Sequence, residues 1–170
     1  GHSSRSLQDF MALLRASQVD CLVDIRKLPG SRAQPQFNAD ALAAALAQRG
    51  IRYLHLAALG GLRGKLAGVP PERNGLWRNA SFHRYADYAG TPAFRAGLEQ
   101  LLEPGQGGRC AIMCAEALWW RCHRRIVADH LLAHGQAVLH IMGPGKLEPA
   151  RLTPGAVVDG AGVVHYPVPP

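Results

Sequence analysis

The sequence lacks any apolar run approaching the roughly 18 residues that cross a bilayer, which excludes a membrane-spanning protein. Heptads, collagen triplets and longer internal repeats are also missing, which excludes coiled coils, collagen-like fibres and solenoids. Lysine is scarce, since Arg outnumbers Lys by 16 to 3. Arg forms bidentate contacts with phosphates and carboxylates, so this ratio suggests an anionic partner, although a codon usage that favours Arg explains it equally well.

The four cysteines are too few for a disulfide-rich scaffold, and the sequence has neither a secretory signal peptide nor a C-x-x-C pair. We therefore expect reduced thiols, a cytoplasmic location and no thioredoxin-like chemistry. Cys21 and Cys110 lie in apolar segments and are expected in the core, whereas Cys114 and Cys122 lie among ionisable residues. Because the first residue is Gly1 rather than Met, we also expect a trimmed chain.

The residues that are present fit one α/β domain spanning residues 1–170, because 170 residues of which 48% are hydrophobic bury a sizeable core. The net charge is +7, and it is distributed unevenly. Residues 1–85 carry 12 Lys and Arg against 5 Asp and Glu, whereas residues 86–170 carry 7 of each kind. The basic excess therefore belongs to the first half of the chain.

Apolar periodicity predicts strands and helices in alternation. Ser6 is the expected N-cap of the first helix, and Thr91-Pro92 is expected to begin the fourth. We predict helices at 7–16, 39–49, 83–89, 92–103 and 121–134, and strands at 21–25, 51–55, 109–114 and 137–142. Strands that alternate with helices form parallel sheets through right-handed crossovers. The predicted fold is therefore a three-layer α/β/α sandwich with a mostly parallel, Rossmann-like sheet.

Two regions lie outside this alternation. Residues 57–80 contain five Gly, two Pro and four basic residues, so we expect a long basic loop with a functional role. Residues 151–170 form a C-terminal extension with weak strand character.

Polar or ionisable residues lie at the end of every predicted strand, including His140 in the last one. Because ligands of open parallel sheets bind at the carboxyl ends of the strands, these side chains are expected to meet in one cleft. The segment 114–125 is the richest in ionisable side chains and joins a strand to a helix. The residues expected at this edge are His2, Ser3, Asp24, Arg26, His55, Cys114, Glu116, Arg121, Cys122, His123 and Arg124.

Many of these residues lie in motifs by which the chain resembles the family called domain of unknown function 488. The motifs are Gly1-His2-Ser3 with Arg5-Ser6, Val23-Asp24-Ile25-Arg26, Pro35-Gln36-Phe37-Asn38, Tyr53-Leu54-His55-Leu56, Leu59-Gly60-Gly61, Tyr85-Ala86-Asp87-Tyr88, Met113-Cys114-Ala115-Glu116 and Cys122-His123-Arg124. The resemblance implies a compact α/β domain of cytoplasmic, mostly prokaryotic distribution, with a strand ahead of Gly1 that this sequence lacks. It implies no activity.

We expect an enzyme, a hydrolase or transferase, that acts on a phosphate-bearing, nucleotide or nucleic-acid substrate. Cys114 or Cys122 would be the nucleophile, because a helix N-terminus and nearby Arg side chains stabilise a thiolate. Glu116 or His123 would carry a proton, and Asp24 completes the expected catalytic set. The expected substrate-binding residues are Arg26, Arg124, Arg121, His55, His2 and Ser3. A cysteine phosphatase is disfavoured, because six residues rather than five separate Cys114 from Arg121 and Trp119-Trp120 stands where Gly is expected.

Two alternatives remain open. One is a nucleic-acid-binding module without catalysis, in which the cations Arg63, Lys65, Arg73, Arg78 and Arg84 act with the aromatic rings of Trp77, Phe82, Tyr85 and Tyr88. The same pattern also fits a solvated basic loop whose aromatic residues pack in the core. The other alternative is a metal-binding protein that uses Cys114, Cys122 and His123 with His2 or His55. The wide spacing of the cysteines disfavours it, so we expect no metal and no cofactor.

Overall fold

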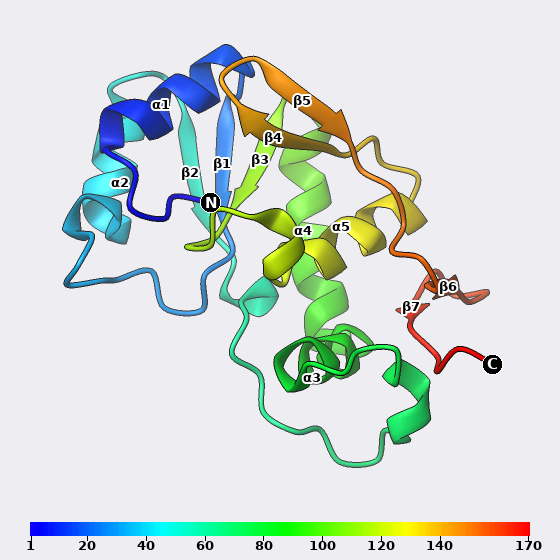
Figure 1. The fold of residues 1–170 in the computed structure, drawn as a ribbon. Coiled ribbons are helices and arrows are strands. Elements are labelled where there is room, and N and C mark those ends of the chain that lie inside the picture. The colour runs from blue at the N-terminus through cyan, green and yellow to red at the C-terminus, as the bar shows by residue number, and fades with distance from the viewer.

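The computed structural model describes residues 1–170, and its centre is a three-stranded parallel sheet. The strands are β1 (Cys21–Asp24), β2 (Arg52–His55) and β3 (Cys110–Met113), in the order β2-β1-β3 (Figure 1). The connection from β1 to β2 contains α2 (Ala39–Ala47), and that from β2 to β3 contains α3 (Ala80–Ala89) and α4 (Pro92–Gln106). These crossovers confirm the predicted alternation for the first three strands.

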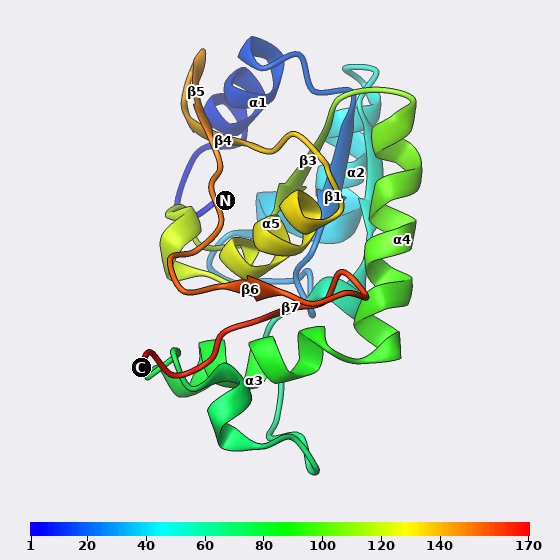
Figure 2. The same cartoon turned by 90° about the vertical axis from the view of Figure 1, so that its right-hand side faces the viewer.

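The two faces of this sheet pack into two separate apolar clusters. Cys21, Val23 and Ile25 belong to a cluster of 17 buried residues that includes side chains of α4 and of α5 (Arg124–Ala133). Leu22 and Met113 belong to a second cluster with α1 (Leu7–Ala16) and α2. Alternate strand residues point to opposite faces, which explains the division. Figure 2 shows helices on both sides of the strands.

The helix ends follow from local chemistry. Ser6 caps α1 as predicted, with its hydroxyl accepting the Asp9 amide at 3.0 Å. Asn38 precedes α2, but its side chain accepts the Ser31 amide at 2.7 Å instead of capping the helix. Helix α4 continues to Gln106 although Pro104 lies inside it, so the predicted end at that proline was wrong. Four short 3-10 helices lie in the connections: η1 (Pro35–Phe37), η2 (Ala57–Leu59), η3 (Pro71–Asn74) and η4 (Trp119–Arg121).

The predicted strand at 137–142 forms, but it does not join the parallel sheet. Strand β4 (Leu139–Gly143) pairs antiparallel with β5 (Lys146–Pro149). Gly145, with φ of 69°, allows the chain to reverse directly after β4, so β4 meets its nearest neighbour in sequence. The fold is therefore a mixed α/β arrangement of five α-helices, one three-stranded parallel sheet and two small antiparallel sheets. The finer expectation of a three-layer, Rossmann-like sandwich stays a prediction.

The C-terminal extension packs against α5. It contains the second of the two antiparallel sheets, which consists of β6 (Val157–Val158) and β7 (Val164–His165). The Asp129 carboxylate on α5 accepts the Tyr166 hydroxyl at 2.7 Å and the Thr153 amide at 2.9 Å. Because Asp129 is buried, these two bonds attach both ends of the extension to the helix. None of the α-helices combines the length and apolar character that a membrane span requires.

Candidate functional site

The carboxyl ends of the three parallel strands bring together most of the predicted site residues. In the strand register, Asp24 lies beside His55 on β2 and beside Met113 on β3, directly before Cys114. The amides of His2 and Ser3 donate to the carbonyl oxygens of Cys114 and Ala115 at 3.0 and 2.8 Å. Segments that are distant in sequence therefore meet at this edge, in two clusters with different chemistry.

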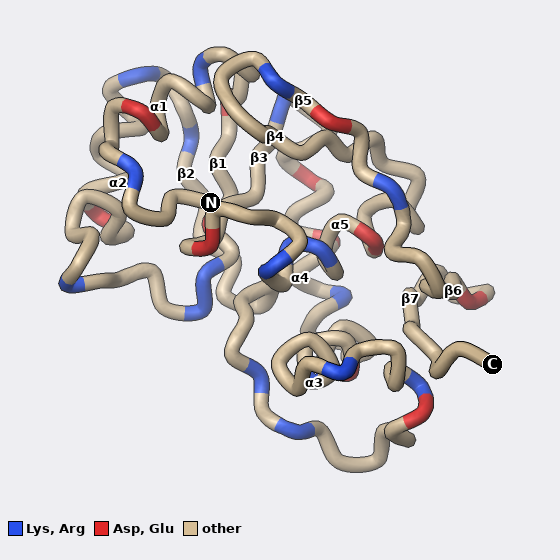
Figure 3. Tube along the Cα trace, viewed as in Figure 1, with Lys and Arg blue, Asp and Glu red and all other residues tan.

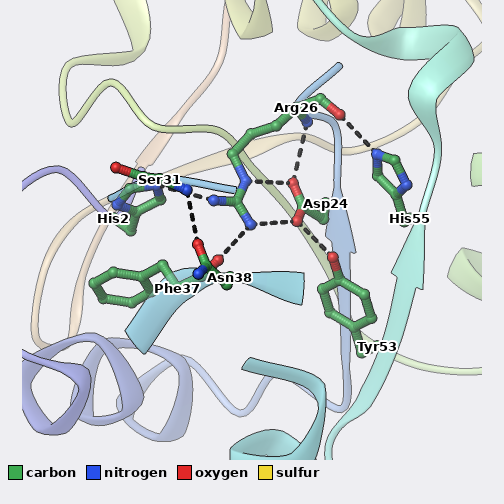
Figure 4. A network of polar contacts seen from close by, with 8 residues as sticks. All are labelled: His2, Asp24, Arg26, Ser31, Phe37, Asn38, Tyr53 and His55. Carbon is green, nitrogen blue, oxygen red and sulfur yellow. Dashed lines mark hydrogen bonds and ion pairs between the residues drawn. The ribbon is translucent and has the colours of Figure 1, made fainter. Parts of the chain in front are cut away.

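The first cluster surrounds the buried ion pair between Asp24 and Arg26 (Figure 4). Asp24 Oδ1 accepts the Arg26 amide at 3.1 Å and its Nε at 2.9 Å, while Oδ2 accepts NH2 at 2.6 Å. The Tyr53 hydroxyl donates to Oδ2 at 2.6 Å. The carboxylate thus receives four hydrogen bonds, which offset the cost of burying its charge.

The remaining Arg26 donors also bind protein groups. NH2 donates to the Phe37 carbonyl at 2.7 Å, and NH1 lies 3.3 Å from His2 Nε2. Burial lowers the pKa of His2, whose ring stacks on Phe37 and is neutral, so Nε2 accepts the Arg26 proton. Four of the five guanidinium N–H groups are therefore occupied. The substrate-binding role of Arg26 and His2 stays a prediction. In the structure, Arg26 holds the end of β1 to η1 through its bonds to Asp24 and to the Phe37 carbonyl.

The second cluster is formed by two thiols and one arginine. Cys114 follows β3, Cys122 follows η4, and their Sγ atoms lie 3.1 Å apart in the protein interior. Cys122 Sγ also accepts the backbone amide and the Nε of Arg124, both at 3.2 Å. The predicted helix start at 121 was wrong, because α5 begins at Arg124, yet the Arg124 amide in its first turn does contact Cys122.

Only one sulfur of this pair is placed to carry a negative charge. A hydrogen bond from Cys114 lowers the pKa of the Cys122 thiol, against the effect of burial, and His123 and Arg124 lower it further. The same hydrogen bond, together with burial, raises the pKa of the Cys114 thiol. These directions favour Cys122 as the sulfur that carries the charge, with Cys114 as its donor.

Arg124 also holds the loop between the two cysteines. Its NH2 group donates to the Glu116 carbonyl and, at 3.2 Å, to the Ala117 carbonyl. The Glu116 carboxylate accepts the Leu118 amide at 3.1 Å, so this half-buried side chain closes a turn of the same loop. Arg121 is exposed at the end of η4. The loop thus carries the buried Cys122 sulfur at one end, the carboxylate of Glu116 and the exposed cation of Arg121.

Two histidines donate to backbone carbonyls directly after β1. His123 Nε2 donates to the Ile25 carbonyl at 3.0 Å, and His55 Nε2 donates to the Arg26 carbonyl at 2.7 Å. Gly61 lies against the His123 ring, where a Cβ would be 3.1 Å from Nδ1. A Cβ on Gly60 would be 2.7 Å from the Lys27 backbone. The pair of glycines is therefore explained by the close approach of this loop to both clusters.

One family model matches the sequence. The model described as domain of unknown function DUF488 matches residues 6–131, which is most of the chain. This chain belongs to the DUF488 family. The matched range includes β1, β2, β3 and both clusters apart from His2. No curated protein and no solved structure matches the chain.

The basic loop of this DUF488 domain is partly structural. The Arg63 guanidinium donates to the carbonyls of Gly60 and Ala57 at 3.0 and 2.7 Å and lies over the Tyr88 ring at 3.8 Å. Trp77 stacks on Phe82 with ring centroids 4.8 Å apart. Other cations of the region are exposed: Lys65, Arg73, Arg78 and Arg84. Figure 3 shows Lys and Arg positions spread along the loop that precedes α3.

A cavity of the DUF488 domain lies close to the second cluster, but neither Cys114 nor Cys122 belongs to its lining. It has a volume of about 630 Å³ and lies between β3 and β4, with mostly apolar walls from α1, α4 and α5. Arg124, Trp119 and His140 belong to its lining. Trp119 and His140 stack with centroids 3.9 Å apart, and burial lowers the pKa of His140 to about 4. No group of three or more His, Cys, Asp or Glu side chains is arranged to hold a metal ion.

Sequence reasoning missed two residues of the first cluster. Tyr53 supplies a hydrogen bond to Asp24, and Phe37 supplies a carbonyl to Arg26 and a ring face to His2. Tyr53 stands two residues before His55 on the same strand, so strand alternation places both side chains on one face. Phe37 has no such signal, because its carbonyl is brought to Arg26 by the path of the loop.

Proposed function

We propose that this chain is an enzyme, a hydrolase or transferase, that acts on a phosphate-bearing, nucleotide or nucleic-acid substrate with Cys122 as its nucleophile. The observation that carries the proposal is the set of donors on Cys122 Sγ: the Cys114 thiol at 3.1 Å and two N–H groups of Arg124 at 3.2 Å. Three donors directed at one buried sulfur stabilise a thiolate, which is the reactive form of cysteine.

The proposed reaction begins with a bond between Cys122 Sγ and an electrophilic atom of the substrate. The bond to the leaving group breaks, and the leaving group takes a proton from Glu116 or His123. Water or an acceptor hydroxyl then takes the group from sulfur, returns a proton to the same residue and regenerates the thiolate. Glu116 is the better placed proton carrier, because the His123 Nε2–H is occupied by the Ile25 carbonyl.

The proposed substrate class rests on charge. Arg121 is exposed three residues before Arg124, and the NH1 group of Arg124 has no protein partner, so both have donors free for an anion. We also propose a cytoplasmic location, since a free thiol pair stays reduced there. The parallel order β2-β1-β3 with apolar clusters on both faces supports the Rossmann-like description of the fold.

The test measures whether purified protein turns over any of three substrates. They are p-nitrophenyl phosphate, bis(p-nitrophenyl) phosphate and a labelled single-stranded oligonucleotide. We expect release of product from at least one of them, abolished by Cys122→Ser and reduced by Glu116→Gln. Cys110→Ser is the matched control, because Cys110 begins β3, at the opposite end of the strand from Cys114. Turnover that persists in Cys122→Ser, or no turnover together with no covalent adduct by mass spectrometry, would contradict the proposal.

A second candidate, nucleic-acid binding without catalysis, is favoured by the exposed cations Lys65, Arg73, Arg78 and Arg84. Binding through phosphates weakens steeply as salt increases, because bound counterions are released. We expect Arg78→Ala to weaken oligonucleotide binding and to reduce its salt dependence. Arg63→Ala is not an equivalent test, because the Arg63 guanidinium holds the loop itself. An affinity that does not change with salt would exclude this candidate.

A further inference from the structure

The two sulfurs of the second cluster are placed for a second kind of chemistry. Cys114 and Cys122 are free thiols whose Sγ atoms lie 3.1 Å apart, although seven residues separate them in the sequence. A disulfide bond is about 2.0 Å long, so bond formation requires an approach of only about 1 Å. The loop that joins the two residues, 115–121, contains the exposed residues Ala115, Leu118, Trp120 and Arg121 and can absorb this shift.

We propose that Cys114 and Cys122 form a reversible disulfide with a hydroperoxide as the oxidant, which makes the pair a redox site of this domain. In the first step Cys122 Sγ attacks the distal oxygen of the peroxide. The O–O bond breaks, the sulfur becomes a sulfenic acid, and the leaving oxygen takes a proton to become water or an alcohol. In the second step Cys114 Sγ attacks the Cys122 sulfur, the S–O bond breaks, and water leaves with the Cys114 proton. The pair loses two electrons and the peroxide gains them.

The geometry gives each cysteine its role in this sequence. Cys122 receives the two Arg124 N–H groups, so it carries the charge and attacks first. Cys114 donates to Cys122, so its sulfur already faces the atom that it must attack. Cys122 is also slightly more exposed than Cys114, at 7% against 4%. A dithiol, such as dithiothreitol, reverses the reaction by thiol–disulfide exchange.

Arg124 is expected to set how easily this disulfide is reduced. Its guanidinium stabilises the thiolate of the reduced form, and the neutral disulfide loses that interaction. A disulfide whose reduced form is stabilised is a strong oxidant. Removal of the Arg124 charge is therefore expected to favour the oxidised form.

The experiment uses a Cys21→Ala/Cys110→Ala background, because those two cysteines also lie opposite each other across β1 and β3. The protein is treated with one equivalent of hydrogen peroxide, blocked with a maleimide and digested with trypsin. Trypsin cleaves after Arg109, Arg121 and Arg124, so the two cysteines fall on separate peptides, 110–121 and 122–124. We expect these two peptides to be linked by a disulfide that dithiothreitol removes, and we expect no link in Cys114→Ala or Cys122→Ala.

Equilibration in dithiothreitol buffers then tests the role of Arg124. We expect Arg124→Met to shift the equilibrium toward the disulfide by about tenfold, or about 30 mV. Arg95→Met is the control and is expected to leave the midpoint unchanged, because Arg95 is exposed on α4 and belongs to neither cluster. Peroxide-treated protein in which both cysteines remain alkylatable, or in which Cys122 passes directly to sulfinic acid, would overturn the proposal. If Arg124→Met does not fold, the peptide maps of Cys114→Ala and Cys122→Ala still test the proposed disulfide.

This redox site does not depend on the proposed hydrolase or transferase function. If both hold, oxidation removes the nucleophile and turnover stops until a dithiol is added. A disulfide without any turnover would contradict only the proposed function, whereas turnover without a disulfide would contradict only the redox site.

Discussion

The two clusters at the sheet edge use the same local geometry for different anions. In the first, the amide and the Nε of Arg26 both bind the Asp24 carboxylate two residues earlier, and NH2 reaches the Phe37 carbonyl. In the second, the amide and the Nε of Arg124 both bind the Cys122 sulfur two residues earlier, and NH2 reaches the Glu116 carbonyl. Each arginine thus clamps an anion and a distant loop at once.

The difference between the two clamps lies in the chemistry of the anion. A carboxylate in a saturated network, with Tyr53 as a further donor, is a stable partner and holds β1, β2 and η1 together. A thiolate in the corresponding position is a nucleophile and can be oxidised. The comparison teaches that burial and ion pairing at this edge do not by themselves mark the reactive residue.

The largest effect is expected for Asp24→Asn. This change leaves the buried Arg26 without its charge partner, which costs about 3 to 5 kcal/mol of the free energy of unfolding. Urea denaturation measures the loss, and Glu99→Gln, on the exposed face of α4, is the control. A loss below about 1 kcal/mol would show that the first cluster is not a structural clamp.

The thiolate cluster is expected to make the stability of the protein depend on pH. An unfolded Cys binds a proton below its pKa of about 8.5, whereas folded Cys122 has a lowered pKa and remains a thiolate. The unfolded state therefore binds more protons, and stability rises with pH up to that value. Between about pH 6.5 and 8.5 we expect wild type to gain up to about 1.4 kcal/mol per pH unit relative to Cys122→Ser. If the free energy of unfolding changes with pH in the same way for wild type and Cys122→Ser, the pKa of Cys122 is not lowered by folding.

A smaller effect is expected for Tyr53→Phe, which removes one hydrogen bond to the Asp24 carboxylate. Hydrogen bonds to charged groups contribute about 1.5 to 3 kcal/mol to stability. Tyr88→Phe is the matched comparison, because its hydroxyl donates at the same 2.6 Å to the neutral carbonyl of Ala58 and should cost about 1 kcal/mol. Chemical denaturation of both variants measures the two values. Equal losses of stability in the two variants would show that the bond to the Asp24 carboxylate is no stronger than the bond to a neutral carbonyl.

Local sequence patterns were sufficient for much of the fold. The capping residue Ser6 and the apolar spacing of 7–16 predicted the first helix with its observed bounds. The partner of a strand is not a local property, which is why 137–142 was expected in the parallel sheet although it pairs with β5. Pro104 failed as an end signal because α4 tolerates it close to its C-terminus.

The candidate site was predictable as a set of residues but not as a set of contacts. Strand ends in a parallel sheet share one edge, so Asp24, His55 and Cys114 could be placed together. The sequence could not show that most Arg26 donors are occupied, because Phe37 and His2 reach it from separate loops. Nor could it show that Cys114 and Cys122 are in contact, because η4 shortens the path between them.

The central claim is that Cys122 is a thiolate stabilised by Cys114 and Arg124. Far-ultraviolet thiolate absorbance, titrated against pH in the Cys21→Ala/Cys110→Ala background, tests it without a substrate. The account predicts one thiolate already present at pH 6, and its loss at that pH in Cys122→Ser. Absorbance that rises only near the pKa of an ordinary thiol, about 8.5, would contradict it.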